Sequence, residues 1–403
     1  MKFRNTLINY AEHSKVAETF LYISYLGYAC LVSLLFCLYS LFPINKKKIV
    51  FCNMKGKRYG DNPYYISESL LEKNKNFDLV WLLKPGVEAE LPKGIRRVDY
   101  SFISVIKELA TAKVWVDSNM KDLGTRKRKE QIFIQTWHGS YGIKKIGLDL
   151  GSEQLCIDRK IYPYNAKLAD LMVSNSKSET EIFRRAFAYG GKVIEQGSPR
   201  NDAFFEVNEE LTTKIQNHFD IRGKHIALYA PTWRKGFGID EFVLNTEDIV
   251  NAFQTRFGGE WVILMRLHPH NIEDSDSIKC SDLVRNATQY PNMQELLCVA
   301  DALITDYSSC MLDFITKPKP CFIYAPDLDD YEKEYGNYYK MKELPFPLAL
   351  SNAELTDNII EFDEEKYIEN VSELHKRVGL NETGHASDSV VDYIIDFIEN
   401  GKK

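Results

Sequence analysis

Short apolar runs alternate with stretches of helical apolar spacing along most of this chain of 403 residues. Such runs, when polar residues bound them, are typical of strands buried in a parallel sheet. The predicted strands are Lys48–Asn53, Leu79–Leu83, Val114–Ser118, Gln131–Thr136, Leu171–Ser174 and Val193–Gln196, then His225–Ala230, Trp261–Leu267, Ala302–Thr305 and Pro320–Tyr324. Helices are predicted near Phe102–Ala110, Glu179–Tyr189, Glu364–Val378 and Ser387–Ile398. This rhythm predicts an α/β fold with doubly wound parallel sheets.

The rhythm is interrupted by a charged stretch at residues 206–223 and then restarts, which predicts two Rossmann-like domains. We place an N-terminal segment at 1–47, a first domain at 48–208, and a second domain with the terminal helices at 209–403. The net charge of −6 gives no indication of a nucleic-acid partner. The eight cysteines show no CxxC or metal-ligand spacing, so we expect free thiols in a reducing compartment.

No charged residue occurs from Phe20 to Phe42, and three lysines follow at 46–48. A segment of this length can cross a hydrocarbon core of about 30 Å. Three interpretations are open: a spanning signal anchor, a hydrophobic helix lying in one leaflet, or a buried core helix. The lysines favour a cytoplasmic location for the rest of the chain. They and the basic run Arg126–Lys129 are either solvated surface or contacts to anionic lipid headgroups.

Five unusual clusters follow predicted strands, at the edge of the sheet where ligands of such folds bind. They are QTWHG (135–139), GSPRND (197–202), APTWR (230–234), RLHPH (266–270) and DYSS (306–309). Each alone could be a turn or a packing contact. Together they carry arginines, which match phosphate oxygens, and histidines, which can take a proton from a hydroxyl. The set predicts a site for a diphosphate and an alcohol nucleophile.

The last cluster lies in Asp301–Phe314, where an apolar run turns through two serines into residues with helical spacing. Unpaired N–H groups and the helix dipole would meet at this turn, which suits a phosphate. The alternative is that Ser308 or Ser309 only caps the helix.

These motifs in this order, together with YGDNPYYISESL after the first strand, resemble the CDP-glycerol glycerophosphotransferase family over roughly residues 48 to 345. The family primes and polymerises teichoic acids and related polyol-phosphate polymers. The resemblance implies two facing Rossmann-like domains of glycosyltransferase-B type, with the donor held mainly by the C-terminal one. It also implies a location at the cytoplasmic face of the bacterial membrane.

Carried over by motif, the resemblance implies His138 and His268 as catalytic residues and Arg200 as a contact to donor phosphate. Ser308 and Ser309 would hold the diphosphate. The other substrate-binding residues that we predict from the same motifs are Asn201, Asp202, Thr232, Arg234, Arg266, Thr305, Asp306 and Asp313.

The reaction expected from this set is phosphoryl transfer, which depends mainly on positioning and charge stabilisation. A hydroxyl of a lipid-linked acceptor attacks the polyol-bearing phosphorus of CDP-glycerol or CDP-ribitol, and CMP leaves. His138 is the expected general base, with His268, Arg200, Arg234 and Arg266 on phosphate, although the two histidines could exchange roles. We expect no metal site and no tightly bound cofactor, and a loosely associated Mg²⁺ on the diphosphate is left open.

Two other functions fit parts of the pattern. One is a glycosyltransferase-B type enzyme that uses a nucleotide sugar. The other is a membrane-bound scaffold that kept the fold and lost the chemistry, against which the intact His138, Arg200 and His268 argue. The sequence leaves open the polyol, the polymer, the number of units added and the oligomeric state.

Overall fold

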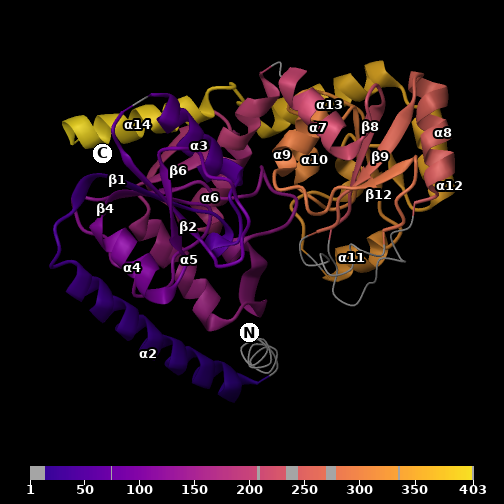
Figure 1. The fold of residues 1–403 in the computed structure, drawn as a ribbon. Coiled ribbons are helices and arrows are strands. Elements are labelled where there is room, and N and C mark those ends of the chain that lie inside the picture. Colours follow the sequence, from indigo (N-terminus) through magenta and orange to yellow (C-terminus); the bar gives the residue numbers. More distant parts are fainter. Residues whose placement is uncertain are drawn as a thin grey trace. The chain divides into compact units, whose positions relative to one another are not determined.

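The computed structural model describes residues 14–73, 75–206, 209–232, 244–268, 278–334 and 336–401. The chain forms two compact units, each built on its own parallel sheet (Figure 1). Unit 1 comprises residues 1–138, 145–200 and 381–403, and unit 2 comprises 139–144 and 201–380. The prediction of two Rossmann-like α/β domains is therefore confirmed.

Unit 1 contains a seven-stranded sheet of order β3-β2-β1-β4-β5-β6-β7, all strands parallel. The strands are β1 (Asn45–Cys52), β2 (Asp78–Leu83), β3 (Ile95–Asp99), β4 (Ala112–Asp117), β5 (Ile132–Gln135), β6 (Leu171–Ser174) and β7 (Lys192–Glu195). The helices are α2 (Lys15–Tyr39), α3 (Asp61–Glu72), α4 (Phe102–Thr111), α5 (Cys156–Leu168), α6 (Lys177–Ala186) and α14 (Ala386–Asn400). Ile66 of α3 and Ile394 of α14 pack on one face of the sheet, and Val32 of α2 and Ile106 of α4 on the other.

Unit 2 contains a six-stranded parallel sheet of order β10-β9-β8-β11-β12-β13. The strands are β8 (His225–Ala230), β9 (Trp261–Met265), β10 (Val284–Asn286), β11 (Ala302–Thr305), β12 (Cys321–Tyr324) and β13 (Leu348–Ala349). The helices are α7 (Glu209–Phe219), α8 (Thr246–Phe257), α9 (Met293–Val299), α10 (Cys310–Phe314), α11 (Leu328–Glu334), α12 (Asn352–Ile360) and α13 (Glu364–Val378). One continuous apolar core, which includes the fully buried Leu228 and Ile304, holds these elements together.

All ten strands predicted from apolar runs are present, and the three that the sequence pattern missed lie at sheet edges. β3 has the sequence IRRVD, and β10 and β13 have only three and two residues. An edge strand is buried on few sides and is often short or charged, so it lacks the apolar run that reveals a central strand.

The structural division differs from the predicted one at the C-terminus. The sequence pattern assigns residues 209–403 to the second domain, whereas Asn381–Lys403 belong to unit 1. The reason is the apolar flank of α14, because Val390, Ile394 and Phe397 are buried in the core of unit 1. Likewise β1 begins at Asn45, inside the segment predicted as the N-terminal anchor.

The uncharged N-terminal segment forms α2, which by length and composition could cross a membrane. Only 17% of its most apolar window, of mean hydropathy 2.0, is buried in the protein, which disagrees with the core-helix interpretation. Val32 and Phe36 are buried against unit 1, while Phe20, Ile23 and Leu34 are exposed. Figure 1 shows α2, in indigo, running beside α4 and α5. The helix therefore has one packed flank and one exposed apolar flank.

The basic run Arg126–Lys129 attaches α2 to the rest of unit 1. Arg128 donates hydrogen bonds to the carbonyl oxygens of Ser40 (3.1 Å) and Phe42 (3.0 Å), just beyond the C-terminus of α2. Arg126 bonds the hydroxyl of Ser33 within the helix. A cation suits the negative end of a helix. Arg126 and Arg128 thus bind other groups of the protein. The sequence left open only a solvated surface or a contact to lipid, so this is a third possibility.

Candidate active site

The predicted residues of unit 2 collect where β8 and β11 end, which is the point where the strand order reverses and where such sheets bind ligands. Asp306 is buried, and its carboxylate accepts hydrogen bonds from the backbone N–H groups of Thr232 (2.9 Å) and Tyr307 (2.6 Å), and from the Thr232 hydroxyl. The buried hydroxyl of Thr305 donates to the carbonyl oxygen of Ala230 at 2.7 Å. These bonds join the two loops, so the three predicted residues build the edge of the site.

Ser308 and Ser309 lie half-buried between β11 and α10. The Ser308 hydroxyl oxygen accepts a long hydrogen bond from the N–H of Cys310, at 3.4 Å, and Ser309 makes no side-chain cap. The helix that follows has only five residues, so its dipole contributes less here than the sequence suggested. Burial raises the pKa of the Cys310 thiol to about 11, which keeps it neutral and unsuited to nucleophilic attack.

Asn201 connects the helices α9 and α10 of unit 2. Its side-chain amide donates to a carboxylate oxygen of Asp313 at 3.2 Å, and its amide oxygen accepts from Gln294 at 2.9 Å. Asn201 and Asp313 are both buried, whereas the neighbouring Asp202 is half-buried. The two hydrogen bonds of Asn201 thus fix α10, which carries Asp313, relative to α9, which carries Gln294.

The fourth cluster follows β9, the strand next to β8. The buried guanidinium of Arg266 donates to the carbonyl oxygens of Ala287 (3.1 Å) and Tyr290 (2.5 Å), which follow β10. These contacts hold the strand end that carries His268, which is half-buried at the same edge of the sheet. Of the predicted residues, Arg234 lies outside the residues that the structure describes.

His138 lies in unit 1, just beyond the end of β5. Its Nδ1 is 3.0 Å from the carbonyl oxygen of Ser118, which follows the neighbouring strand β4. A carbonyl oxygen can only accept a hydrogen bond, so Nδ1 carries a proton, and Nε2 is the nitrogen that can accept one in the neutral ring. The Trp137 ring packs against the imidazole at a tilt of 34°, with ring centroids 4.2 Å apart, and Trp137 has the left-handed backbone angle φ 52°. The imidazole is therefore oriented by one hydrogen bond and by a turn with an unusual backbone conformation.

Arg200 is also in unit 1, and it is 4% exposed. Its guanidinium forms an ion pair of 2.9 Å with Asp61, and its backbone N–H donates to the side-chain oxygen of Asn62 at 3.1 Å. Asn62 in turn donates to the carbonyl oxygen of Thr136, at 3.2 Å, in the loop that precedes His138. Arg200 is thus coupled through one asparagine to the histidine loop.

The partners Asp61, Asn62 and Ser118 were missed as site residues. Asp61 and Asn62 belong to the YGDNPYY stretch that carried part of the resemblance, and Asp61 has a positive φ of 63°. A GDN sequence in the loop that follows a buried strand and precedes a helix was the available signal. Among the described residues, no group of three or more His, Cys, Asp or Glu side chains is arranged to hold a metal ion.

The family of the chain follows from a match along most of its length. A model of the family described as CDP-Glycerol:Poly(glycerophosphate) glycerophosphotransferase matches residues 34–396. The chain belongs to this family. The resemblance inferred from the motifs is confirmed, and the match extends beyond the motifs at both ends.

Named relatives come from teichoic acid synthesis. A teichoic acid glycerol-phosphate transferase of Staphylococcus aureus is 31% identical, over 87% of this chain and 93% of the relative. A teichoic acid poly(glycerol phosphate) polymerase of Bacillus subtilis is 29% identical over 89% of this chain, and the match spans only half of that relative's length. A teichoic acid ribitol-phosphate primase of Bacillus spizizenii is 26% identical, over 90% of this chain and 94% of the relative.

Solved structures of the wall teichoic acid polymerase TagF have the same fold. One superposes with a TM-score of 0.80 at 27% identity, over 96% of this chain and all of that chain. Another, a TagF variant soaked with CDPG, gives a TM-score of 0.78. Almost all of this chain therefore has the fold of the TagF polymerase.

Proposed function

We propose that this protein transfers a polyol phosphate from a CDP-polyol to a hydroxyl group of a lipid-linked acceptor, in the synthesis of teichoic acid or a related polymer. Family membership over residues 34–396 is the observation that carries this proposal. Relatives named for glycerol phosphate and for ribitol phosphate support a CDP-polyol donor, as does the TagF soak with CDPG. These relatives are named for polyol phosphates rather than for a nucleotide sugar, so the glycosyltransferase alternative is not favoured.

In the proposed reaction, the acceptor oxygen forms a bond to the phosphorus that bears the polyol. The bond from that phosphorus to the oxygen shared with CMP breaks, and CMP leaves with that oxygen. Nε2 of His138 takes the proton of the acceptor hydroxyl, because its Nδ1–H is committed to the Ser118 carbonyl. No oxidant or reductant is needed for this exchange.

The remaining predicted residues would act on the donor. We propose that His268 with Ser308 and Ser309 contacts the donor phosphates from the carboxyl edge of the unit 2 sheet. Arg266 and Arg200 make bonds within their own units, so we assign Arg266 to positioning His268 and Arg200 to positioning the histidine loop. The charge of Arg266 adds to the field at the phosphates. We propose no tightly bound cofactor.

Incubating the full chain with CDP-glycerol, CDP-ribitol or a UDP-sugar, each with a lipid-linked acceptor, tests the reaction. We expect CMP release with one or both CDP-polyols and a product heavier by one or more polyol phosphate units in mass spectrometry. Release of UDP with a glycosylated product, and no reaction of either CDP-polyol, would contradict the proposal.

We further propose that α2 lies in the plane of the membrane at its cytoplasmic face. Its packed flank is held by unit 1, including the hydrogen bond from the N–H of Cys156 to Glu18 (2.7 Å) near one end and the Arg128 contacts at the other. Its exposed flank, with Phe20, Ile23 and Leu34, carries no charge and would enter the leaflet.

Cysteines placed at Lys15 and Lys46, on either side of the apolar stretch, distinguish the two membrane orientations. The background is a chain in which the exposed Cys30, Cys37 and Cys280 are changed to alanine. An in-plane helix keeps both ends on the cytoplasmic side, so neither Lys15→Cys nor Lys46→Cys should react with an impermeant maleimide in intact protoplasts. Both should react after lysis, which serves as the control. Reaction at one position in intact protoplasts would show a spanning helix.

A further inference from the structure

Unit 1 contains a cavity of about 330 Å³ that none of the predicted motifs lines. It lies where β1 and β4 end, because Cys52 and Asp117, the last residues of these strands, both line it. These neighbouring strands mark the reversal of strand order in the sheet of unit 1. The cavity therefore occupies the position where open α/β sheets bind ligands.

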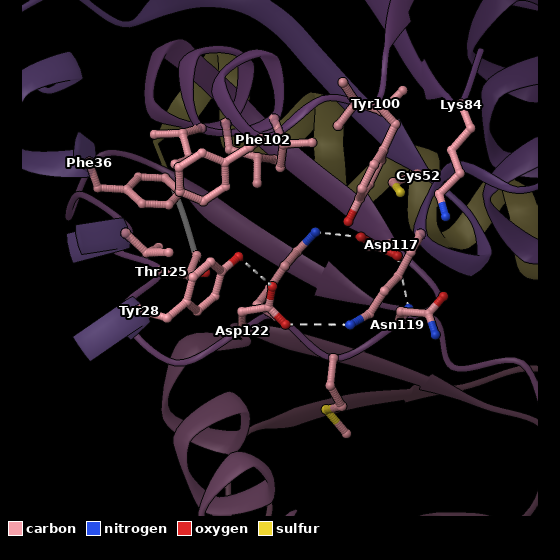
Figure 2. Close-up of a pocket in the computed structure, with 18 residues that line it drawn as sticks. Tyr28, Phe36, Cys52, Lys84, Tyr100, Phe102, Asp117, Asn119, Asp122 and Thr125 are labelled. Carbon is pink, nitrogen blue, oxygen red and sulfur yellow. Dashed lines mark hydrogen bonds and ion pairs between the residues drawn. The ribbon is translucent and has the colours of Figure 1, made fainter. Parts of the chain in front are cut away.

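The cavity has one apolar side and one polar side. In Figure 2 the rings of Tyr28, Phe36 and Phe102 gather on one side, while Lys84 and Asp117 lie across from them. The apolar residues come from α2 and α4, and the polar ones from the loops after β1, β2 and β4. The lining is thus suited to a molecule with an apolar part and a polar head.

The polar side carries more positive than negative groups. It has three lysines, Lys55, Lys84 and Lys121, against two carboxylates, Asp117 and Asp122. Burial raises the pKa of the Cys52 thiol and of the Tyr100 phenol, which also line the cavity, so both stay neutral. The head that this side would take is an anion.

Two of the three lysines can bind an anion without breaking a close ion pair. Lys121 is paired with Asp117, and both side chains are buried. Lys55 is 3.4 Å from Asp122, at an exposed and long contact, and Lys84 has no carboxylate partner among the described residues. Two ammonium groups at one site suit a phosphate or diphosphate.

The backbone around Lys55, which lines the cavity, has an unusual left-handed conformation. Met54, Lys55 and Gly56 all have positive φ, of 47°, 54° and 77°. Non-glycine residues seldom adopt this conformation, and such strain collects at ligand sites. A Cβ atom at Gly56 would lie 2.7 Å from the Cβ of Tyr100, another lining residue, so the turn depends on glycine.

The apolar side leads out to the surface. Phe102 is 39% exposed, and Ile103, the next residue of α4, is 44% exposed. The ring of Phe102 lies 5.7 Å from that of Tyr28 on α2, the helix whose other flank is exposed and apolar. A hydrocarbon chain that leaves the cavity over Phe102 would therefore continue along an apolar surface.

The polar end of the cavity adjoins the proposed general base. Asp117 and Asn119 line the cavity, and the carbonyl oxygen of Ser118, between them, accepts the hydrogen bond of His138. A head group held by Lys55 and Lys84 would extend any attached hydroxyl-bearing group toward the loop that carries His138.

We propose that this cavity binds the phosphate end of a lipid phosphate, namely the acceptor lipid of the transfer reaction, with its hydrocarbon chain leaving beside α2. This inference rests on the proposed function, which supplies a lipid-linked acceptor. The cavity volume, at the lower end of the range of about 300–1,000 Å³ for small-molecule sites, holds the head and the start of the chain.

The test measures binding of the full chain to neutral phosphatidylcholine vesicles that carry either a long-chain polyprenyl phosphate or an equal amount of phosphatidylglycerol. We expect tighter binding to the polyprenyl phosphate vesicles. The double variant Lys55→Gln, Lys84→Gln should weaken that binding about tenfold, which corresponds to one lost charged hydrogen bond. Binding to phosphatidylglycerol vesicles should not change. Lys93→Gln, which removes an exposed charge of unit 1 outside the cavity lining, is the matched control.

A second variant, Val105→Trp, fills the cavity from α4 and keeps all three lysines. It should also lower binding to the polyprenyl phosphate vesicles, with thermal unfolding as the check that it folds. Equal binding by wild type and the double lysine variant would overturn the inference. So would an equal loss on phosphatidylglycerol vesicles, or full competition by millimolar inorganic phosphate, since these would indicate a general anionic-lipid contact or a free-phosphate site.

The binding readout separates this inference from the proposed function. A chain that transfers polyol phosphate but binds polyprenyl phosphate independently of the cavity retains the function and loses the inference. A chain that binds polyprenyl phosphate through the cavity but releases no CMP from a CDP-polyol retains the site and loses the function.

Discussion

Replacing His138 with alanine is expected to lower the rate of polyol phosphate transfer by about 10²–10⁴ at saturating CDP-polyol, the usual contribution of a general base. The imidazole is held for this role by the 3.0 Å hydrogen bond from Nδ1 to the Ser118 carbonyl and by the Trp137 ring. Binding of the donor should be unchanged, because the donor residues that we propose lie in unit 2 and His138 lies in unit 1.

The measurement is CMP release under single-turnover conditions, with donor affinity measured separately by calorimetry. His385→Ala is the matched control, because this histidine is also in unit 1 but has an exposed side chain at the start of α14. It should transfer at the wild-type rate. A His138→Ala variant that turns over at near the wild-type rate would remove His138 as the base, and a similar test of His268→Ala would then decide whether the two histidines exchange roles.

Replacing Asp306 with alanine is expected to destabilise unit 2 by about 3 kcal/mol. The buried carboxylate accepts bonds from the Thr232 N–H, the Thr232 hydroxyl and the Tyr307 N–H, so its removal leaves several donors without an acceptor. Because these bonds join the loops after β8 and β11, donor affinity should fall as well. Asp306→Asn keeps one acceptor oxygen and should lie between alanine and wild type.

Urea denaturation followed by circular dichroism gives the loss of stability. Asp301→Ala is the matched control on the same strand, because Asp301 lies at the opposite end of β11, has a partly exposed side chain and accepts one hydrogen bond, from the Ile226 N–H at 2.8 Å. We expect it to cost less than about 1.5 kcal/mol. Similar losses for both variants would mean that Asp306 has no special role in joining the loops.

The central strands and the residue clusters that follow them could be predicted because both are written in consecutive residues. An apolar run such as Ala302–Thr305 indicates a strand buried on both faces, and DYSS follows it directly. The same reasoning could not detect β3, since an edge strand such as IRRVD is only partly buried. Nor could it show that the helix after DYSS has a single turn, because that end is set by packing within unit 2.

Several side chains that we predict to bind substrate also form hydrogen bonds or ion pairs within their own units. Arg266 donates to two backbone carbonyl oxygens, and Arg200 is paired with Asp61. A motif identifies which residues occur at a site. It does not show whether the N–H groups of an arginine are bonded to other protein groups. Only the neighbours in space, which here come from residues 21 to 139 positions away, distinguish the two cases.

The apolar periodicity and the motifs are written in the sequence itself, and they were sufficient to predict the α/β class, the two domains and the family. Three features emerged only from the folded chain: which flank of α2 is packed, that α14 belongs to unit 1, and that a cavity with a positive side lies at the ends of β1 and β4. These features depend on contacts between segments far apart in the chain, such as Tyr28 with Asp122 and Lys55 with Asp122. No local pattern encodes such a contact, since it forms only when folding brings the segments together.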